Sequence, residues 1–504
     1  MMNSIVETIK TVNGAVNGFV WGIPMLILLV GTGILMTCLT KVFQITHIKC
    51  WWKNTIGSIF TNRHITSHTD KEDKAISQFQ SLCTALAATI GTGNIVGVAS
   101  ALLFGGPGAI FWMWIVAFFG MMTNYSENVL GIYFRRKNDR DEWCGGAMYY
   151  LRDGLGAKKY CKHIGAVLAV LFSVFCLLAS FGIGNMGQIN SIAGNIESAF
   201  EIKPLYTGIV LMIIAALVII GGLKRIASVT EKLVPFMAIA YIIGTIVICV
   251  MNIDQLIPAF RSIFHFAFSA KAIGGGVTGF SIKMAITWGM KRGVFSNEAG
   301  LGSSVMVHSN SNVKEPVRQG MWGIFEVFAD TIVVCTLTAL TVLTSGLVDL
   351  ETGAVLSSNE GSALVSEAFS LQFGSFGGKF IAISILLFAF STVLGWSHYG
   401  TKAFEYLFGT KATVVYKTIF VVFIVIGATM KMDLAWDLSD TFNGLMAIPN
   451  LIGVVTLSPI VYKITINYVA RAIKGKKIEP MVSAIPEVQE QISAEIKAEG
   501  YVEK

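Results

Sequence analysis

Long apolar segments follow one another along almost the whole chain, and short loops with proline or paired glycines separate many of them. The hydrocarbon core of a bilayer is about 30 Å thick, and a helix needs roughly 20 apolar residues to cross it. Segments of this kind cross the membrane as helices, because lipid offers no hydrogen-bond partners and a helix pairs its backbone groups within itself. The sequence therefore predicts an all-α polytopic membrane protein with about eleven transmembrane helices. The predicted ranges are 18–39, 78–104, 107–134, 163–199, 204–223, 233–251, 273–307, 318–346, 375–401, 412–430 and 437–467.

The composition excludes most other classes of protein. Of the residues, 54% are hydrophobic and only 14% are charged, whereas an average soluble protein is roughly 25% charged. Disordered, collagen-like and disulfide-scaffold chains are excluded. The net charge of +7 comes from cations in short loops, without the basic stripe and interleaved aromatic residues of a nucleic-acid binder. Eight scattered cysteines without a CxxC pattern predict reduced side chains. We therefore expect the lipid bilayer, and no nucleic acid, as a partner.

The basic residues of the short loops indicate how the chain lies in the membrane. Twenty-five Lys and Arg residues fall in loops on one side of the predicted bundle, and six fall on the other. Cytoplasmic loops carry the excess of such residues. The bias predicts an N-terminus outside and a C-terminus in the cytoplasm, as an odd number of helices requires.

The order of the helices predicts an inverted repeat. After one extra N-terminal helix, the other ten divide into two sets of five, and five is odd, so the second set enters the membrane from the opposite side. We expect residues 1–76 to hold the extra helix and a cytoplasmic loop, residues 77–251 the first repeat and residues 273–467 the second. Residues 468–504 form a polar, Glu-rich cytoplasmic tail that we expect to be loosely ordered.

The first helix of each repeat contains closely spaced glycines beside polar residues. In the first repeat Gly91, Gly93 and Gly97 lie within seven residues, and in the second the stretch 289–302 combines four glycines with Ser296, Asn297 and Glu298. Transporters bind their cargo where helices break near the midplane and free backbone groups for a ligand. Close helix packing would explain one such segment. Two segments at matching positions favour broken helices.

Other polar side chains inside the predicted spans are costly in lipid and mark either a pathway or a buried pair. Gln188 lies among small residues that would expose its amide to a cavity, so we expect it to contact a substrate. The acids in the predicted spans are Glu127, Glu298, Glu326 and Asp330. They could form structural pairs or act in gating, or they could bind a cation, and both alternatives stay open. For Glu127, Arg135 is a candidate pairing partner, and Lys291 or Arg292 could neutralise one of the others.

Several of these motifs together resemble the bacterial and archaeal alanine or glycine:cation symporter family. The stretches that carry the resemblance are Gly91-Thr92-Gly93-Asn94, Gly106-Pro107-Gly108, Gly145-Gly146-Ala147-Met148-Tyr149-Tyr150, the run 295–303, Gly395-Trp396-Ser397 and the run 443–450. The resemblance extends over about residues 75–467. It implies a leucine-transporter-like fold in a prokaryotic cell membrane, with sodium- or proton-coupled import of small amino acids, chiefly alanine and glycine.

A zwitterionic amino acid needs hydrogen-bond donors at one end and acceptors at the other. We expect the freed N–H groups of Thr92, Gly93 and Asn94, at a helix N-terminus, to bind its carboxylate. Unwound carbonyls between Phe295 and Ala299 would accept from its ammonium group. Phe295 and Trp396 would enclose the small side chain and limit the size of the cargo.

The coupling ion is predicted beside the first break. Ser391 and Thr392 are adjacent hydroxyls in a predicted span, and they resemble the Ser/Thr pair of the principal sodium site in sodium-coupled members of the fold. The carbonyls of Ala87 and Ile90, freed by the break, would complete the set of neutral oxygens for sodium, which is co-transported. The alternative is that both hydroxyls bond back to carbonyls one turn earlier, as Ser and Thr often do in membrane helices.

Other functions remain open at this stage. A carrier of the same fold could transport another small cargo or couple to protons instead of sodium. A membrane-embedded enzyme would need a nucleophile and base, or a metal centre, inside the spans. The sequence contains no HExxH or GxSxG motif and no paired intramembrane histidines, so an enzyme is not expected.

Overall fold

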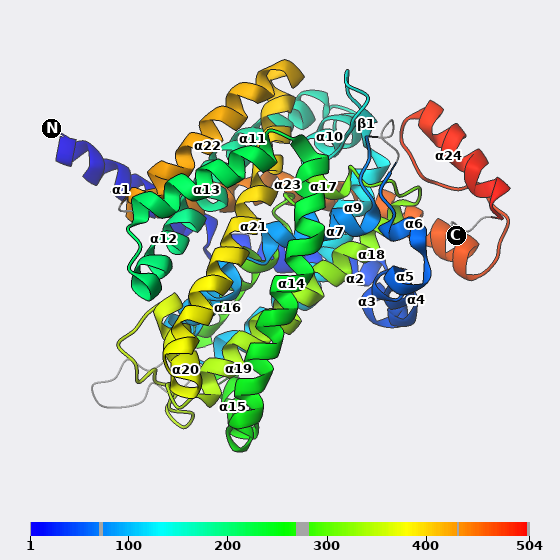
Figure 1. Ribbon diagram of the computed structural model, residues 1–504. Coiled ribbons are helices and arrows are strands. Elements are labelled where there is room, and N and C mark those ends of the chain that lie inside the picture. Colours follow the sequence, from blue (N-terminus) through cyan, green and yellow to red (C-terminus); the bar gives the residue numbers. More distant parts are fainter. Residues whose placement is uncertain (1, 70–73, 269–281, 431–432, 501–504) are drawn as a thin grey trace.

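The computed structural model describes residues 2–69, 74–268, 282–430 and 433–500 (Figure 1). The regular structure of these residues is helical, apart from a two-stranded antiparallel hairpin of β1 (Arg136–Lys137) and β2 (Trp143–Cys144). The first part of the chain forms α1 (Met2–Val20), α2 (Ile23–Leu39) and the short helices α3 (Phe43–Thr46), α4 (Ile48–Asn54), α5 (Ile56–Thr61) and α6 (Arg63–Thr66).

The two predicted repeats follow as sets of helices with intervening breaks. The first contains α7 (Gln78–Thr89), η1 (Thr92–Asn94), α8 (Val96–Gly105), α9 (Gly108–Tyr133), α10 (Ala147–Tyr149), η2 (Tyr150–Leu155), α11 (Lys162–Phe181), η3 (Gly182–Met186), α12 (Gly187–Phe200), α13 (Pro204–Ile219) and α14 (Gly222–Met251), and α15 (Ile253–Phe268) connects it to the second. The second contains α16 (Ile282–Asn297), α17 (Val305–His308), α18 (Pro316–Val327), η4 (Phe328–Cys335), α19 (Thr336–Thr344), α20 (Ser362–Phe373), α21 (Ser375–Phe408), η5 (Thr410–Ala412), α22 (Thr413–Thr429), α23 (Asp433–Tyr468) and η6 (Val469–Ile473).

Length and hydropathy identify eight continuous helical segments among the described residues that could cross a membrane, or nine when the bent pair α7 and η1–α8 counts as one span. The two remaining predicted spans differ for identifiable reasons. The helix predicted over 204–223 is α13, which has only 16 residues. The helix predicted over 273–307 has its first residues, 273–281, outside the described residues, and it breaks after Asn297.

The two sets of helices pack against each other in matching pairs. Helix α8 contacts α16, α9 contacts α18, α12 contacts α21, and α13 contacts α22. Each pair joins helices that hold the same place in the two predicted repeats. The predicted fold class, an all-α polytopic bundle with a broken first helix in each half, is confirmed.

The first break has a local cause in the sequence. Ser77 and Gln80 form a capping box that fixes the start of α7. The helix ends at Thr89, where a Cβ on Gly91 would lie 2.4 Å from Thr392 Oγ1, so this close approach requires glycine. The Gly91 N–H donates to Asn94 Oδ1 at 2.9 Å, which replaces a backbone partner lost at the break. The chain then resumes as α8, bent by 58° from α7.

The second break follows α16. Glu298, Gly300 and Gly302 have φ angles of 56°, 92° and 75°. These left-handed conformations are natural for glycine and uncommon for glutamate. They interrupt the helix between Asn297 and Val305, so both breaks that the glycine pattern predicts are present.

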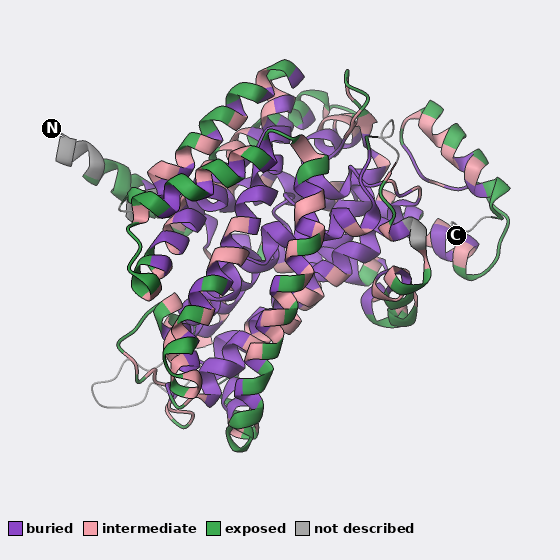
Figure 2. Cartoon of the chain, in the orientation of Figure 1, coloured by how far each residue is buried: buried purple, intermediate pink, exposed green. Residues whose placement is uncertain are grey.

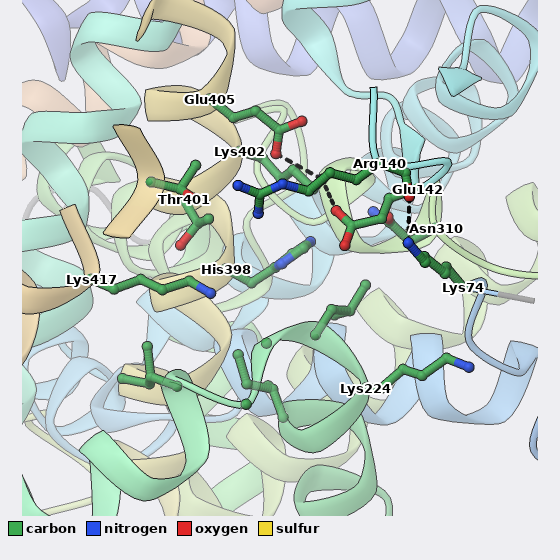
Figure 3. Close-up of a pocket in the computed structure, with 16 residues that line it drawn as sticks. Lys74, Arg140, Glu142, Lys224, Asn310, His398, Thr401, Lys402, Glu405 and Lys417 are labelled. Atoms are coloured by element: carbon green, nitrogen blue, oxygen red, sulfur yellow. Dashed lines mark hydrogen bonds and ion pairs between the residues drawn. The ribbon is translucent and has the colours of Figure 1, made fainter. Parts of the chain in front are cut away.

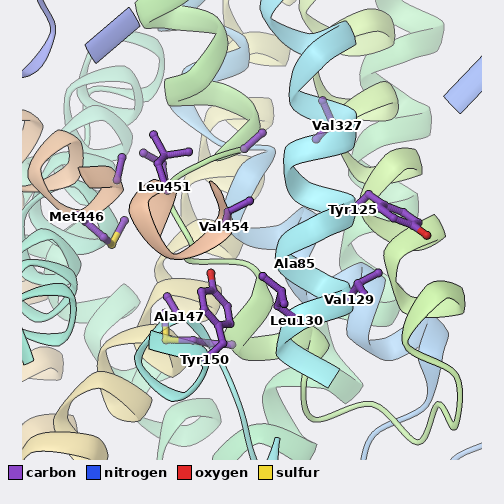
Figure 4. Packing of buried hydrophobic residues seen from close by; sticks show 14 of the residues in the cluster. Ala85, Tyr125, Val129, Leu130, Ala147, Tyr150, Val327, Met446, Leu451 and Val454 are labelled. Atoms are coloured by element: carbon purple, nitrogen blue, oxygen red, sulfur yellow. The ribbon is translucent and has the colours of Figure 1, made fainter. Parts of the chain in front are cut away.

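Buried residues fill the centre of the bundle, and exposed residues lie on its outside (Figure 2). Many of the exposed residues are large and apolar. In the interior, Leu130 lies on the side of α9 toward Val454 of α23, and Val129 lies on the other side, where a Cβ on Gly320 of α18 would be 2.9 Å from its Cγ2 (Figure 4). On the outside, helices such as α13 and α14 expose large apolar side chains, for example Leu217. An apolar exterior is what a bilayer requires.

The tail differs from the loose segment expected from the sequence. Residues Pro486–Ala498 form helix α24, and the Ala484 N–H donates to the Tyr133 carbonyl at 2.8 Å. Lys314 forms ion pairs with Glu495 at 3.1 Å and Glu499 at 2.8 Å. The glutamates that suggested disorder therefore have a basic partner in the loop before α18.

Candidate functional site

A small pocket lies at the first helix break, between the two halves of the bundle. Residues of the break, η3, α12, α16, α21 and α23 surround it, and they leave an open volume of about 10 Å³, roughly the minimum for one water molecule. The lining residues are Ala88, Thr89, Gly91, Thr92, Gly93, Ile183, Gln188, Phe295, Glu298, Thr392, Trp396 and Asn443. The pocket is therefore nearly closed and is bounded by both broken helices.

Five of the seven residues predicted to bind a substrate line this pocket. They are Thr92, Gly93, Gln188, Phe295 and Trp396. Gln188 reaches both sides of the pocket: its Nε2 donates to the Ile183 carbonyl at 3.0 Å, and its Oε1 accepts from the Thr92 N–H at 3.4 Å. The Gln188 amide thus bridges η3 and η1.

Asn94 does not line the pocket. Its Nδ2 donates to Asp330 Oδ1 at 2.7 Å, and its Oδ1 accepts from the Gly91 N–H. The backbone N–H of Asn94 donates to the Gly91 carbonyl at 3.3 Å. Asn94 therefore connects the break to η4, where Ser296 Oγ also donates to Asp330 at 2.8 Å.

Ala299 also lies outside the pocket lining. Its N–H donates to Asn297 Oδ1 at 3.0 Å, and the residue is buried. A Cβ on Gly120 would lie 3.1 Å from the Ala299 Cβ, which places Ala299 against α9. The left-handed conformation of Glu298 turns the chain away from the pocket at this point.

Two polar residues of the pocket, Glu298 and Asn443, were not among the predicted site residues, although a polar residue inside a predicted span indicates either a pathway or a buried pair. Glu298 accepts from Trp396 Nε1 at 2.9 Å and from Ser303 Oγ at 2.5 Å. Asn443, which belongs to α23, also lines the pocket. Besides their polar type and predicted depth, both residues belong to stretches that carry the family resemblance, 295–303 and 443–450.

Two buried polar atoms at the pocket have no hydrogen-bond partner among the described residues. They are Thr92 Oγ1 and Asn443 Oδ1. A buried polar atom without a partner costs about 1–3 kcal/mol. Both atoms are therefore available to a polar ligand.

Three of the four residues predicted to bind sodium, Ala87, Ser391 and Thr392, meet beside the break. Ser391 Oγ lies 3.2 Å and Thr392 Oγ1 lies 3.1 Å from the carbonyl oxygen of Ala87. The same hydroxyls lie 2.8 Å and 3.0 Å from the carbonyl oxygen of Phe388, one turn earlier in α21. Ile90 caps the end of α7, immediately before Gly91. The backbonding alternative accounts for the Phe388 contacts and does not account for the two contacts with Ala87.

The buried acids outside the pocket have identified partners. Glu127 pairs with Asn450 and not with Arg135, whose guanidinium donates to carbonyls of residues 309–313. Glu326 contacts His308 at 2.9 Å. Lys291 forms an ion pair with Asp440 at 2.7 Å, so it does not neutralise the acids at the break. The described residues contain no cluster of His, Cys, Asp and Glu that could hold a metal ion.

Comparison with known proteins identifies a family whose sequences resemble this chain. The signature of the sodium:alanine symporter family matches residues 6–482. A sodium/alanine symporter, AgcS, of Methanococcus maripaludis is 47% identical over 88% of this chain and 94% of its own length. A probable sodium/glutamine symporter, GlnT, of Bacillus subtilis is 35% identical over 93% of each chain.

Among solved structures, MhsT in complex with L-phenylalanine covers 78% of this chain and 99% of its own length. The identity is 16% and the TM-score is 0.49.

Proposed function

The chain belongs to the sodium:alanine symporter family, and from this premise we propose that it imports alanine and glycine in symport with sodium. Cation-coupled symport of an amino acid across a membrane is the activity that membership of this family establishes. We assign the cargo to the pocket at the helix breaks and propose alternating access of this pocket to the two sides of the membrane. The observation that carries this assignment is the pair of unpartnered buried oxygens, Thr92 Oγ1 and Asn443 Oδ1, in a pocket bounded by both broken helices.

The chemistry of the lining suits the two ends of a zwitterion. At η1, the Gly93 N–H and the Thr92 hydroxyl can donate to a carboxylate, and so can the Thr92 N–H once it gives up its 3.4 Å hydrogen bond to Gln188. At the other side, the Glu298 carboxylate and Asn443 Oδ1 can accept from an ammonium group. Charge-assisted hydrogen bonds of this kind are stronger than neutral ones, so both ends of the cargo would be held.

The two aromatic rings beside the pocket favour small cargo. The pocket's open volume of about 10 Å³ requires the surrounding side chains to move before any amino acid enters. Phe295 and Trp396 bound it on the apolar side, and a long side chain would have to displace both rings. A relative named for glutamine makes a larger cargo the main competing hypothesis.

Uptake into proteoliposomes tests the proposal. We expect labelled alanine to accumulate above its external concentration when a sodium gradient is directed inward, and to exchange in counterflow with unlabelled alanine or glycine. A proton gradient without sodium should not drive accumulation. Accumulation of glutamine in preference to alanine, or accumulation driven by protons alone, would contradict the proposed cargo or the proposed ion.

Trp396 provides a second test of the site, because its indole N–H donates to Glu298. The substitution Trp396→Phe keeps most of the ring and removes this donor. The hydrogen bond contributes about 1 kcal/mol, so we expect alanine to bind about fivefold more weakly in calorimetry. Trp114→Phe is the matched control, since Trp114 donates to Thr336 at 2.8 Å away from the pocket. Equal affinity in wild type and Trp396→Phe would remove Trp396 from the site.

Cysteine labelling tests the orientation that the loop charges predict. In a variant without its native cysteines, we expect a membrane-impermeant maleimide to label Lys10→Cys in intact cells and Lys476→Cys only after the cells are opened. Lys10 and Lys476 are both exposed charged residues, so accessibility reports the side of the membrane. Labelling of both positions in intact cells would contradict the predicted topology.

A further inference from the structure

A second and larger pocket lies where several loops meet at one end of the bundle (Figure 3). Its volume is about 300 Å³. The loop before α7, the β1–β2 hairpin, the start of α14, the segment after α17, and helices α21 and α22 all contribute to it. The distribution of basic residues predicts that this end faces the cytoplasm. The pocket shares no lining residue with the one at the helix breaks.

The ionisable lining of this second pocket is mostly basic. His398 lines the pocket together with five cations and two acids. The cations are Lys74, Arg140, Lys224, Lys402 and Lys417, and the acids are Glu142 and Glu405. Both acids lie beside the same lysine, since Lys402 Nζ is 3.0 Å from Glu405 and 3.7 Å from Glu142. Among the described residues, neither acid of the lining forms an ion pair with Arg140 or Lys417.

Three of the basic side chains approach one another from different elements. Lys417 on α22, Arg140 in the hairpin turn and His398 on α21 point toward the same space (Figure 3). The Arg140 guanidinium donates one hydrogen bond, to the Thr410 carbonyl at 3.0 Å, and the ammonium of Lys417 has no hydrogen-bond or ion-pair partner among the described residues.

His398 adds an independent indication of a ligand. The residue is only 4% exposed, yet its Nε2 has no hydrogen-bond partner within the described part of the chain. A buried polar atom normally has a partner. Because this atom lines a pocket between two cations, an oxyanion that carries both negative charge and an O–H donor would complete its bonding.

We propose that this pocket binds a phosphate group, carried either by a small soluble anion or by the headgroup of an anionic phospholipid. Arginine offers paired donors that fit the oxygens of a phosphate, and lysine supplies a compact charge. Polar groups that come from three directions suit a tetrahedral oxyanion. At the floor of the pocket, a protonated phosphate oxygen would donate to Nε2 of His398, and the Thr401 hydroxyl lies beside it.

The position of the pocket suggests how a bound ligand would affect the conformation of the protein. Lys74 lies just before α7 and Asn310 just after α17, and the two broken helices are connected there by a β-bridge between Ile76 and Ser311. A bound phosphate would link α21, α22 and the hairpin to this junction. Binding should therefore stabilise the state in which this end of the bundle is closed.

Thermal unfolding of the purified full-length protein tests the soluble ligand. At constant ionic strength, replacing chloride with inorganic phosphate should raise the unfolding temperature of the wild type in a saturable way, because a ligand that binds only the folded state stabilises it. Arg140→Gln with Lys417→Gln should raise the phosphate concentration for half-maximal stabilisation at least fivefold. The control is Lys159→Gln with Arg261→Gln, which removes two exposed cations outside the pocket.

Lipid retention tests the other source of phosphate. After purification in mild detergent from membranes that contain phosphatidylglycerol, native mass spectrometry should show this lipid on the wild type and on the control pair, and less of it on Arg140→Gln with Lys417→Gln. Phosphate stabilisation without retained lipid supports a soluble ligand, and retention without phosphate stabilisation supports a headgroup. Equal behaviour of the two pairs of substitutions in both measurements would overturn the proposal. Neither measurement involves transport, so a failure of the proposed cargo would not affect the result.

Discussion

Replacing Gly93 with valine should abolish measurable binding of alanine while the protein stays folded and monodisperse. A Cβ at this position would lie 3.1 Å from Ser296 Cα and 3.3 Å from Phe295 Cδ1. Ser296 Cα belongs to the backbone of α16, so it cannot rotate away. The two methyl groups of valine would then either push α16 from the break or fill the small pocket. Either outcome removes the place where we expect the cargo carboxylate to approach the backbone.

Calorimetry with alanine in saturating sodium measures this effect, and we expect at least a hundredfold loss of affinity, about 2.8 kcal/mol. Gly93→Ala adds only the Cβ, so its loss should be smaller than that of valine. Gly31→Val is the matched control, because a Cβ on Gly31 meets nothing within 4 Å. Wild-type affinity in Gly93→Val would show that the cargo binds elsewhere.

The fold could be predicted from the sequence to the extent that it depends on local patterns. Hydropathy identified the spans, and the glycines at 91 and 93 identified the first break, because both signals lie within a few consecutive residues. The count of helices is less certain from composition, since α13 is short and still pairs with α22 as its counterpart. Packing against a partner determines that helix more than its own length does.

The site was only partly predictable, because side-chain direction depends on contacts distant in sequence. Asn94 and Gly93 are neighbours, yet Asn94 turns to Asp330, 236 residues away, while Gly93 faces the pocket. Glu298 joins the pocket through Trp396, 98 residues away. No periodicity within one helix encodes such pairs. The expectation for Ala299 assumed that its backbone continues along the pocket, and the positive φ angle of Glu298 ends that path.

Substituting Ser391→Ala together with Thr392→Val should raise the sodium concentration for half-maximal alanine uptake at least tenfold. The reason lies in the number of hydrogens available. Each hydroxyl carries one hydrogen, but the two hydroxyls make four close contacts with the carbonyl oxygens of Ala87 and Phe388. At most two of the four contacts can be two-centre hydrogen bonds. The other two either share one of those hydrogens or bring together oxygen atoms with none between them.

A cation explains this arrangement better than backbonding alone. Hard cations bind carbonyl and hydroxyl oxygens, and here the oxygens come from α7, where it ends at the break, and from α21. The hydroxyls can donate to Phe388 and offer lone pairs to sodium at the same time. Removing both hydroxyls would leave carbonyl ligands such as Ala87, so sodium affinity should fall without the site being lost. A tenfold change corresponds to about 1.4 kcal/mol.

The sodium dependence of uptake in proteoliposomes measures this prediction. Ser384→Ala with Thr418→Val is the matched control, since both of these hydroxyls bond back to carbonyls of their own helices, Phe380 at 2.8 Å and Val414 at 3.0 Å. If backbonding were the whole role of Ser391 and Thr392, the two pairs of substitutions would change the sodium dependence equally. A tenfold shift confined to Ser391 and Thr392 requires that their lone pairs face the ion. An unchanged sodium dependence with uptake intact would place the coupling ion away from Ala87, and Asp330, which already joins Asn94 and Ser296, would then be the next acid to test.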